Sequence, residues 1–141
     1  MGEARPFRFV HPVEVRFRDL DAIGHVNNAV YLTYLESARL AWWRQVSGRE
    51  RYDMMLARAE VDYRSPVVFG ESLAVGVRCA SIKRSSFVLE LEVRERETGR
   101  LVAEARKVCV HFDHGAGRSA PLPADLRARF RAQDPELVEQ E

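Results

Sequence analysis

The side chains most able to do chemistry stand close together near the start of the chain. They are two carboxylates, Asp19 and Asp21, followed by His25 and the amides Asn27 and Asn28. An aspartate is normally ionised at neutral pH, so it can act as a general base or as a nucleophile. This group predicts a site for acid–base or nucleophilic chemistry directly in front of the segment that follows.

That following segment has the spacing of a helix. Apolar side chains at positions 31, 34, 35, 38 and 42 form a stripe, which predicts a helix over Asn28–Val46 that ends at Gly48. Asn27 or Asn28 would cap its start. The free N–H groups and partial positive charge of such a start can hold an oxyanion, while Asp21 acts on an activated carbonyl such as a thioester. In a second interpretation, both aspartates only shape an Asx turn and complement the helix dipole.

The rest of the chain reads mainly as strands that would position this site. A strand is predicted over 9–17, with Val13, Val15 and Phe17 on its buried face, and four more near 59–64, 73–79, 87–94 and 101–112. The apolar parity of the last strand shifts, which predicts a bulge near Arg106. Beyond it we expect a short surface helix over 124–131 and a frayed tail over 134–141.

This order of elements predicts an α+β fold in which a long antiparallel sheet wraps around one central helix. We expect a single domain over residues 1–141, with its core at about 8–113 and a C-terminal extension over 114–141. Helices do not alternate with the strands, so a doubly wound parallel sheet is disfavoured.

Composition excludes several classes of protein. The net charge of +1 argues against nucleic-acid binding through bulk charge. No apolar run approaches the ~18 residues of a membrane span. Residues 1–9 lack the apolar region of a signal peptide, so we expect a cytoplasmic protein. Cys79 and Cys109 are too few for a disulfide framework and too far apart for a metal knuckle, so we expect both to be buried.

Two other chemistries can be considered for the polar group. Asp19 and Asp21 form the Asp-x-Asp of a magnesium-dependent phosphatase of the haloacid dehalogenase kind, but that chemistry needs a parallel βαβ scaffold that this chain lacks. Both aspartates and His25 could instead ligate a metal with His111 or His114. No second histidine follows at helical spacing and no cysteine pair is present, so no metal site is predicted.

The run from Asp21 to Arg39, Asp-Ala-Ile-Gly-His-Val-Asn-Asn-Ala-Val-Tyr-Leu-Thr-Tyr-Leu-Glu-Ser-Ala-Arg, closely resembles the signature of the 4-hydroxybenzoyl-CoA thioesterase family, in its acyl-CoA thioesterase branch. The predicted order of elements over roughly 8–113 is similar to the hotdog fold of that family. The resemblance implies an enzyme that hydrolyses the thioester bond of an acyl-CoA, with no metal or other cofactor beyond the coenzyme A of the substrate.

The resemblance also implies roles for individual residues. Asp21 matches the catalytic aspartate of the family, and the N–H near Asn28 matches the donor that polarises the thioester carbonyl. Gly24, His25 and Asn27 would line or shape the substrate site, with a purely structural role for His25 and Asn27 as the alternative. Asp19 matches no catalytic position, and we expect it to be structural.

A second segment, Lys83-Arg84-Ser85-Ser86-Phe87, resembles the basic segment with which the family contacts the nucleotide or pantetheine arm. On this basis Lys83, Arg84 and Ser86 are predicted to bind substrate, whereas the simpler interpretation is a solvated hairpin turn. The resemblance further implies a homodimer or a homotetramer whose subunits pair their sheets side by side, with the active sites at the interface.

Two alternatives to the thioesterase stay open from the sequence. Dehydratases that act on acyl-CoA or acyl-carrier protein share the fold, and His25 with Glu36 would have to serve as their acid–base pair. The chain could also be a binding module for acyl-CoA that performs no turnover.

Overall fold

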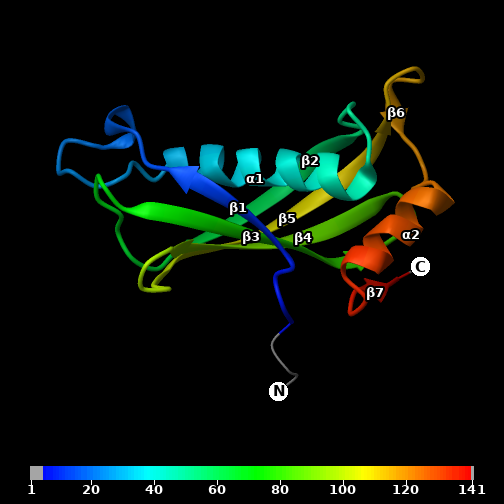
Figure 1. Cartoon of the computed structure of the whole chain (residues 1–141). Helices are drawn as coiled ribbons and strands as arrows, with labels where there is room; N and C mark the ends of the chain where they lie inside the picture. Colours follow the sequence, from blue (N-terminus) through cyan, green and yellow to red (C-terminus); the bar gives the residue numbers. More distant parts are fainter. Residues whose placement is uncertain (1–4, 141) are drawn as a thin grey trace.

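The computed structural model describes residues 5–140, in which one helix lies along a curved antiparallel sheet (Figure 1). This is the α+β arrangement predicted from the order of elements. The elements are β1 (Phe9–Glu14), the 3-10 turn η1 (Phe17–Asp19), α1 (Val30–Ser47), β2 (Met54–Tyr63), β3 (Ser72–Ile82), β4 (Ser86–Glu95), β5 (Leu101–Asp113), β6 (Arg118–Ser119), α2 (Ala124–Gln133) and β7 (Val138–Glu139).

The five long strands are ordered β1-β3-β4-β5-β2, and every neighbouring pair among them is antiparallel. The chain enters the sheet at one edge with β1, crosses its face with α1 and returns at the far edge with β2. The remaining strands then fill the middle as consecutive hairpins. The helix is therefore flanked by both edges of the sheet that curls around it (Figure 1).

The predicted alternation of β3 and β4 is confirmed by burial. Leu73, Val75 and Val77 of β3 and Leu89 and Leu91 of β4 are at most 2% exposed. Because successive residues of a strand point to opposite faces, these side chains form one apolar layer in the hydrophobic core. Burying each such side chain contributes about 1.5–3 kcal/mol, which is what holds the sheet against the helix.

Helix α1 agrees with its predicted span to within two residues at its start and one at its end. Leu35, Ala38 and Trp42 are fully buried along its inner face. It ends at Gly48, whose φ of +69° is the left-handed conformation that glycine adopts at least cost, and whose N–H donates to the carbonyl of Arg44 at 3.1 Å. Among residues 5–140, neither helix combines the length and apolarity of a membrane span.

The first strand is shorter than predicted. β1 ends at Glu14, and Phe17 lies in η1 with 77% of its surface exposed rather than on a buried face. The chain turns here because the carboxylate of Asp19 accepts the N–H of Arg16 at 2.9 Å, which closes a turn in place of a further pair of strand residues. β1 therefore remains a six-residue edge strand that contains Pro12.

The predicted bulge near Arg106 is wrong. β5 pairs in continuous register through this position with both of its neighbours, Glu90 of β4 and Glu60 of β2. The inner face of β5 keeps the odd-numbered positions, and the apolar pattern breaks because one of them is the polar Lys107. Lys107 is 1% exposed, and its Nζ lies 3.7 Å from the carboxylate of Glu36. Burial lowers the pKa of Lys107, against the opposing charge of Glu36. The register shifts instead between Leu56 and Arg58 of β2, between Cys79 and Ser81 of β3, and, where β4 meets the start of β5, between Val93 and Arg94.

Strand β2 is the one long strand whose side chains are exposed on both faces. It begins at Met54, five residues before the predicted strand, and pairs only with β5 among the described residues. Met55, Leu56 and Tyr63 are 51%, 40% and 45% exposed, so apolar surface accompanies the unpaired backbone. An unpaired edge of this length offers its free N–H and C=O groups to a further strand.

The C-terminal region is more ordered than predicted. Helix α2 runs to Gln133, and its Phe130 is fully buried with its ring centroid 5.1 Å from that of Trp42. The predicted frayed tail is wrong over its described part, because β7 pairs in parallel with β3. Asp134 anchors this segment, since its buried carboxylate accepts the N–H of Cys79 at 2.9 Å where the bulge of β3 leaves that group without a strand partner.

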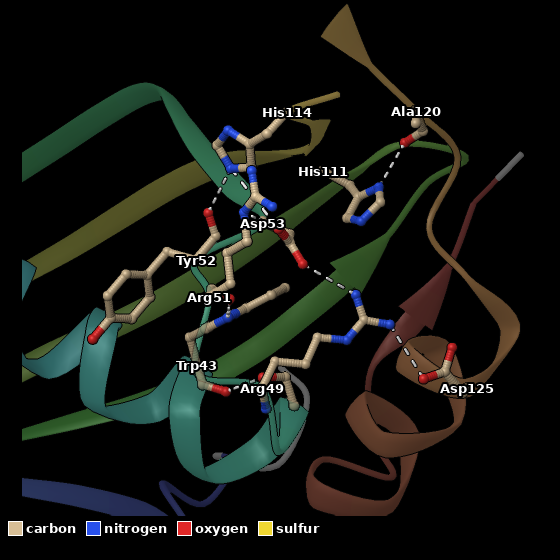
Figure 2. A network of polar contacts seen from close by, with 10 residues as sticks. Trp43, Arg49, Arg51, Tyr52, Asp53, His111, His114, Ala120 and Asp125 are labelled. Carbon is tan, nitrogen blue, oxygen red and sulfur yellow. Dashed lines mark hydrogen bonds and ion pairs between the residues drawn. The ribbon is translucent and has the colours of Figure 1, made fainter. Parts of the chain in front are cut away.

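Polar contacts fasten α2 to the end of α1 as well. The guanidinium of Arg49 lies between Asp53, at 3.4 Å, and Asp125 of α2, at 3.2 Å (Figure 2). The connection between α1 and β2 is thereby tied to the start of α2. These half-exposed pairs contribute little energy individually, so the buried aromatic contact of Phe130 should dominate the attachment.

Truncating that aromatic ring tests whether α2 belongs to the core. We expect Phe130→Ala to lower the free energy of unfolding by about 3–5 kcal/mol, because it leaves a cavity beside Trp42 and Phe87. Urea denaturation followed by tryptophan fluorescence measures the change. Ala128→Ser on the exposed face of the same helix is the control and should shift it by less than about 0.5 kcal/mol. A loss below about 1 kcal/mol for Phe130→Ala would mean that α2 is the surface helix predicted from the sequence.

Candidate active site

A pocket lies at the N-terminal end of α1, where the chain between η1 and the helix meets the end of β2. Its volume is about 520 Å³. Four of the predicted site residues line it together, namely Asp21, His25, Asn27 and Asn28. The other lining residues are Ile23, Val26, Tyr31, Tyr63, Arg64, Ser65 and Pro66.

Asp21 occupies a tight turn that leaves one of its carboxylate oxygens free. Its Oδ1 accepts the N–H groups of Ile23, at 2.9 Å, and His25, at 3.2 Å. Its own N–H donates to the carbonyl of His25 at 2.7 Å. Within residues 5–140 no donor reaches Oδ2, so this half-buried oxygen is available to a molecule in the pocket. The Asx turn predicted as an alternative role is therefore present, and it orients the carboxylate.

The start of the helix supplies the opposite kind of group. Asn27 closes the turn that precedes the helix, because its Oδ1 accepts the N–H of Ala29 at 2.9 Å and its carbonyl accepts the N–H of Val30 at the same distance. The N-cap position of α1 is Ala29, which offers no side-chain acceptor, so the cap predicted at Asn27 or Asn28 is wrong. The N–H of Asn28 donates to no acceptor among residues 5–140. A backbone donor without a partner, at the positive end of a helix and beside a pocket, can hold an oxygen that gains negative charge.

Two tyrosines form an aromatic wall beside these groups. The rings of Tyr31 and Tyr63 meet edge to face with centroids 5.2 Å apart. The hydroxyl of Tyr63 donates to the carbonyl of Asn28 at 2.8 Å, which ties the end of β2 to the start of the helix. Burial raises the pKa of Tyr31, so that hydroxyl stays neutral and the wall adds no charge to the pocket.

Asp19 is buried and fully engaged, in agreement with the structural role expected for it. At 2% exposure its Oδ2 accepts the hydroxyl of Tyr34 at 2.7 Å, and its Oδ1 pairs with the guanidinium of Arg16 at 3.0 Å. Burial alone would raise its pKa, but the hydrogen bonds from Tyr34 and Arg16 outweigh it and hold the pKa below the ordinary value. Its carbonyl also accepts the N–H of Asn27 at 2.9 Å. Asp19 thus holds in place the loop between η1 and α1, which contains Asp21.

Gly24 and His25 shape the turn between the two halves of the site. Gly24 has a φ of +83°, and a Cβ built on it would meet nothing within 4 Å. This left-handed conformation favours glycine, although a Cβ would have room. Gly24 is not among the residues that line the pocket, so its predicted place in the site is limited to shaping the turn beside it. His25 is half-buried, pairs through its backbone with Val68 and lines the pocket.

The predicted substrate-binding residues of the second segment are not beside Asp21. Lys83, Arg84 and Ser86 belong to the β3–β4 hairpin, at the other end of the sheet near α2 (Figure 1). Ser86 is in register with Val110 of β5, which is paired with Met55 near the start of β2. Because the pocket lies at the end of β2, the two groups are separated by nearly the whole length of the sheet within one chain.

The residues considered as metal ligands are likewise divided between the two ends. His111 lies in β5 opposite Met54, and Nε2 of His114 lies 3.0 Å from the carbonyl oxygen of Tyr52 (Figure 2). Asp21 and His25 line the pocket at the other end of α1. In the part of the chain that the structure describes, no three His, Cys, Asp or Glu side chains are gathered as metal ligands.

Sequence reasoning misses the aromatic wall. It assigns Tyr31 only to the apolar stripe of the helix, and Tyr63 only to the alternation of a strand. Their positions carry a signal, because Tyr31 is the second residue of α1 and Tyr63 is the last residue of β2, so each stands at an end of its element. The long-range contact that joins them depends on the placement of β2 at the far edge of the sheet, which the local pattern does not encode.

Comparison with known proteins connects this arrangement to a family. The sequence model of the thioesterase-like superfamily matches residues 15–130. The long-chain acyl-CoA thioesterase FadM of Escherichia coli (strain K12) is 27% identical over 126 residues, which cover 84% of this chain and 93% of FadM. The acyl-CoA thioester hydrolase YbgC of Escherichia coli O157:H7 is 27% identical over 129 residues, 87% of this chain and 96% of YbgC.

Solved structures agree. A thioesterase from Thermus thermophilus, crystallised with coenzyme A and Zn, superposes with a TM-score of 0.83 at 41% identity and covers 92% of this chain and 96% of its own. A predicted thioesterase from Bacillus stearothermophilus superposes with a TM-score of 0.81 at 25% identity, over 94% of this chain and 98% of its own. These matches confirm the predicted hotdog fold, the long antiparallel sheet around one central helix.

The anchoring role of Asp19 predicts a pH-dependent loss of stability on Asp19→Asn. Since the folded pKa of Asp19 is lowered, its ionised form stabilises the fold above the unfolded pKa of about 3.9, and this contribution disappears as the pH falls through the folded value. We expect Asp19→Asn to cost roughly 1–3 kcal/mol at pH 7 and progressively less below pH 4. Urea midpoints across pH 2.5–7 measure this, with the exposed Asp62→Asn as the control. An equal cost at every pH would contradict the assignment.

Proposed function

Because the chain belongs to the thioesterase-like superfamily, we propose that it hydrolyses the thioester bond of an acyl-CoA in the pocket that Asp21 and Asn28 share. One observation carries the proposal: Asp21, whose Oδ2 accepts no hydrogen bond within residues 5–140, and Asn28, whose N–H donates none there, line the same pocket. The acyl-CoA thioesterases FadM and YbgC match most of this chain and support the choice of substrate class. The narrower assignment to the 4-hydroxybenzoyl-CoA thioesterase family is part of the same proposal.

Hydrolysis needs a base, a site for the oxyanion and a leaving group. Asp21 takes a proton from a water molecule as that water attacks the carbonyl carbon of the thioester. The N–H of Asn28 donates to the carbonyl oxygen as it becomes an oxyanion, aided by the positive end of α1. The tetrahedral intermediate then expels the thiolate of coenzyme A, which takes up the proton, and the free acid is released.

A covalent route uses the same groups. Here Oδ2 of Asp21 attacks the carbonyl carbon, the thiolate leaves, and water hydrolyses the resulting anhydride. Single turnover in ¹⁸O-labelled water separates the routes, because only the covalent one puts label into Asp21. Neither route uses a metal ion or a prosthetic group. Gly24 supplies the left-handed turn next to Asp21, while His25 and Asn27 maintain the shape of the site.

The distance between Asp21 and the basic hairpin supports a dimer. A two-fold axis at the open edge of the sheet pairs β2 with its copy in antiparallel fashion, so the start of one β2 meets the end of the other. The partner subunit's Lys83, Arg84 and Ser86 would then lie about three strand spacings, or ~14 Å, from this chain's β2 at the end where the pocket opens. The nucleotide end of coenzyme A can bind there while the thioester reaches Asp21. The subunits form a homodimer, or a homotetramer built from two such pairs.

The dehydratase alternative fits the geometry less well. It requires His25 and Glu36 to act as a pair, but Glu36 is absent from the lining of the pocket. Its carboxylate is engaged by Arg39 and Lys107 between α1 and β5. The polar groups that do meet in the pocket are those of a thioester hydrolase.

Asp21→Asn tests the role of the carboxylate. The amide oxygen of asparagine can still accept the N–H groups of Ile23 and His25, so the turn should persist while the base is lost. We expect the kcat for an acyl-CoA to fall by about 10²–10⁴-fold with little change in unfolding free energy. Release of free thiol over a panel of acyl-CoA chain lengths measures it. Full activity of Asp21→Asn would contradict the mechanism, and tight acyl-CoA binding without turnover in the unaltered chain would favour a binding module.

The exposed edge of β2 predicts a dimer in solution. We expect a mass two or four times the 16.2 kDa of the chain by light scattering at micromolar concentration. The double variant Met55→Glu/Leu56→Glu should shift it to the mass of the chain and lower activity, because a two-fold interface repeats each charge. Val10→Glu, at a similarly exposed position on β1, is the matched control and should remain dimeric. A monomeric unaltered chain with full activity would overturn the shared site.

A further inference from the structure

Exposed apolar side chains stand beside the pocket of Asp21. They are Phe17, Ile23, Val68 and Phe69, each between 45% and 77% exposed, and we call these four residues the apolar ledge. They come from two loops at the end of the sheet where α1 begins, one between β1 and the helix and the other between β2 and β3 (Figure 1). Apolar surface of this kind, placed next to a polar pocket, marks a place for an apolar partner or ligand.

The two loops that form the ledge are joined to each other and held in shape. The rings of Phe17 and Phe69 meet edge to face, with their centroids 5.9 Å apart. The N–H of Val68 donates to the carboxylate of Glu71 at 2.9 Å, which closes the turn between β2 and β3. The ledge is therefore present before any ligand arrives, and a ligand need not order it on binding.

The ledge is continuous with the pocket. Ile23 belongs to both, since it lines the pocket while three quarters of its surface is exposed. Val68 is paired through its backbone with His25, which also lines the pocket. The N–H of Val26, another lining residue, donates to the carbonyl of Val67 at 2.9 Å. A molecule that fills the pocket can therefore extend onto the ledge.

The topology of the sheet determines on which side of the pocket the ledge lies. Residues 64–71 connect β2, at one edge, with β3, which is next to β1 at the other edge. Pro66 of this connection lines the pocket, and Phe69 follows toward β3 with its Cα within ~11 Å of that of Pro66. The coenzyme A of the proposed substrate would enter over the edge of β2. The ledge lies on the other side of the pocket, which is the side left for the acyl group.

We propose that the apolar ledge binds the distal part of a long acyl chain, so that Phe17, Ile23 and Phe69 make the chain selective for long-chain acyl-CoA. The proposal rests on the proposed function, because the thioester must lie at Asp21 for its acyl group to reach the ledge. The four side chains have no hydrogen-bonding group, so they fit methylene groups and not the phosphates or amides of coenzyme A. Each methylene group fully removed from water strengthens binding by about fourfold.

Removing the two rings of the ledge tests the proposal. We expect Phe17→Ser/Phe69→Ser to lower kcat/KM for lauroyl-CoA roughly tenfold, the effect of about two methylene groups left in water, and to change that for butyryl-CoA less than about twofold. A butyryl group is too short to leave the pocket, and neither ring lines it. Release of free thiol measures both values. Val10→Ser, at a similarly exposed position on β1, is the matched control and should change neither.

A single variant keeps the test independent of the fold of the double one. Phe69→Gln leaves the ring of Phe17 in place and should show a smaller loss of the same kind, for lauroyl-CoA alone. An equal loss for both substrates, or no loss for lauroyl-CoA, would overturn the proposal. Light scattering distinguishes a second copy of the chain as the occupant. A double variant with half the mass of the unaltered protein would show that the ledge is a contact between subunits, and would overturn the proposal too.

Calorimetry separates this proposal from the proposed function, because binding needs no turnover. In the Asp21→Asn background, Phe17→Ser/Phe69→Ser should raise the Kd for lauroyl-CoA about tenfold and leave that for butyryl-CoA nearly unchanged. A chain that shows this difference in binding but cleaves no acyl-CoA refutes only the proposed function. A chain that cleaves acyl-CoA with the same preference for chain length after both rings are removed refutes only the ledge.

Discussion

The site depends on one buried carboxylate that performs no chemistry. Asp19 binds the hydroxyl of Tyr34 on the helix, the guanidinium and N–H of Arg16 on the preceding turn, and through its carbonyl the N–H of Asn27. It therefore joins the end of the first strand, the turn that contains Asp21 and the first turn of α1. A carboxylate at 2% exposure is stable only while these donors remain, so the three segments keep their relative positions together.

Much of the fold could be predicted from the sequence because apolar periodicity and burial agree in its centre. Helix α1 and strands β3 and β4 have clean patterns, since each has one face against the core. The predictions failed where polar residues take inner positions or apolar ones take outer positions. Lys107 is buried with Glu36 as its partner, and Phe17 is exposed with its ring edge to face against Phe69. Such placements follow from tertiary pairing, which local spacing does not contain.

The candidate site was predictable to a similar degree. Asp21 and the start of the helix are close in sequence, so their meeting in one pocket follows from a strand, a turn and a helix in succession. Tyr63 reaches that pocket only because β2 lies at the far edge of the sheet, thirty-five residues after Asn28. The hairpin at Lys83 resembles part of the same site in sequence, yet it lies at the other end of the chain's own sheet. In the proposed dimer the hairpin would serve the partner's pocket, and the sequence of one chain does not show that such residues belong to two subunits.

The two edges of the sheet are unequal, and this limits how many chains can associate through it. β1 is six residues long and contains Pro12, which has no N–H to offer a further strand, whereas β2 presents ten residues without proline or glycine. A sheet with two such open edges could grow by repeated addition, as fibres do. The proposed pairing through β2 would consume the only long open edge of the described sheet and turn the short, proline-bearing edges outward. Edge-to-edge growth would then terminate at two chains, so the surface proposed for association would also prevent polymerisation.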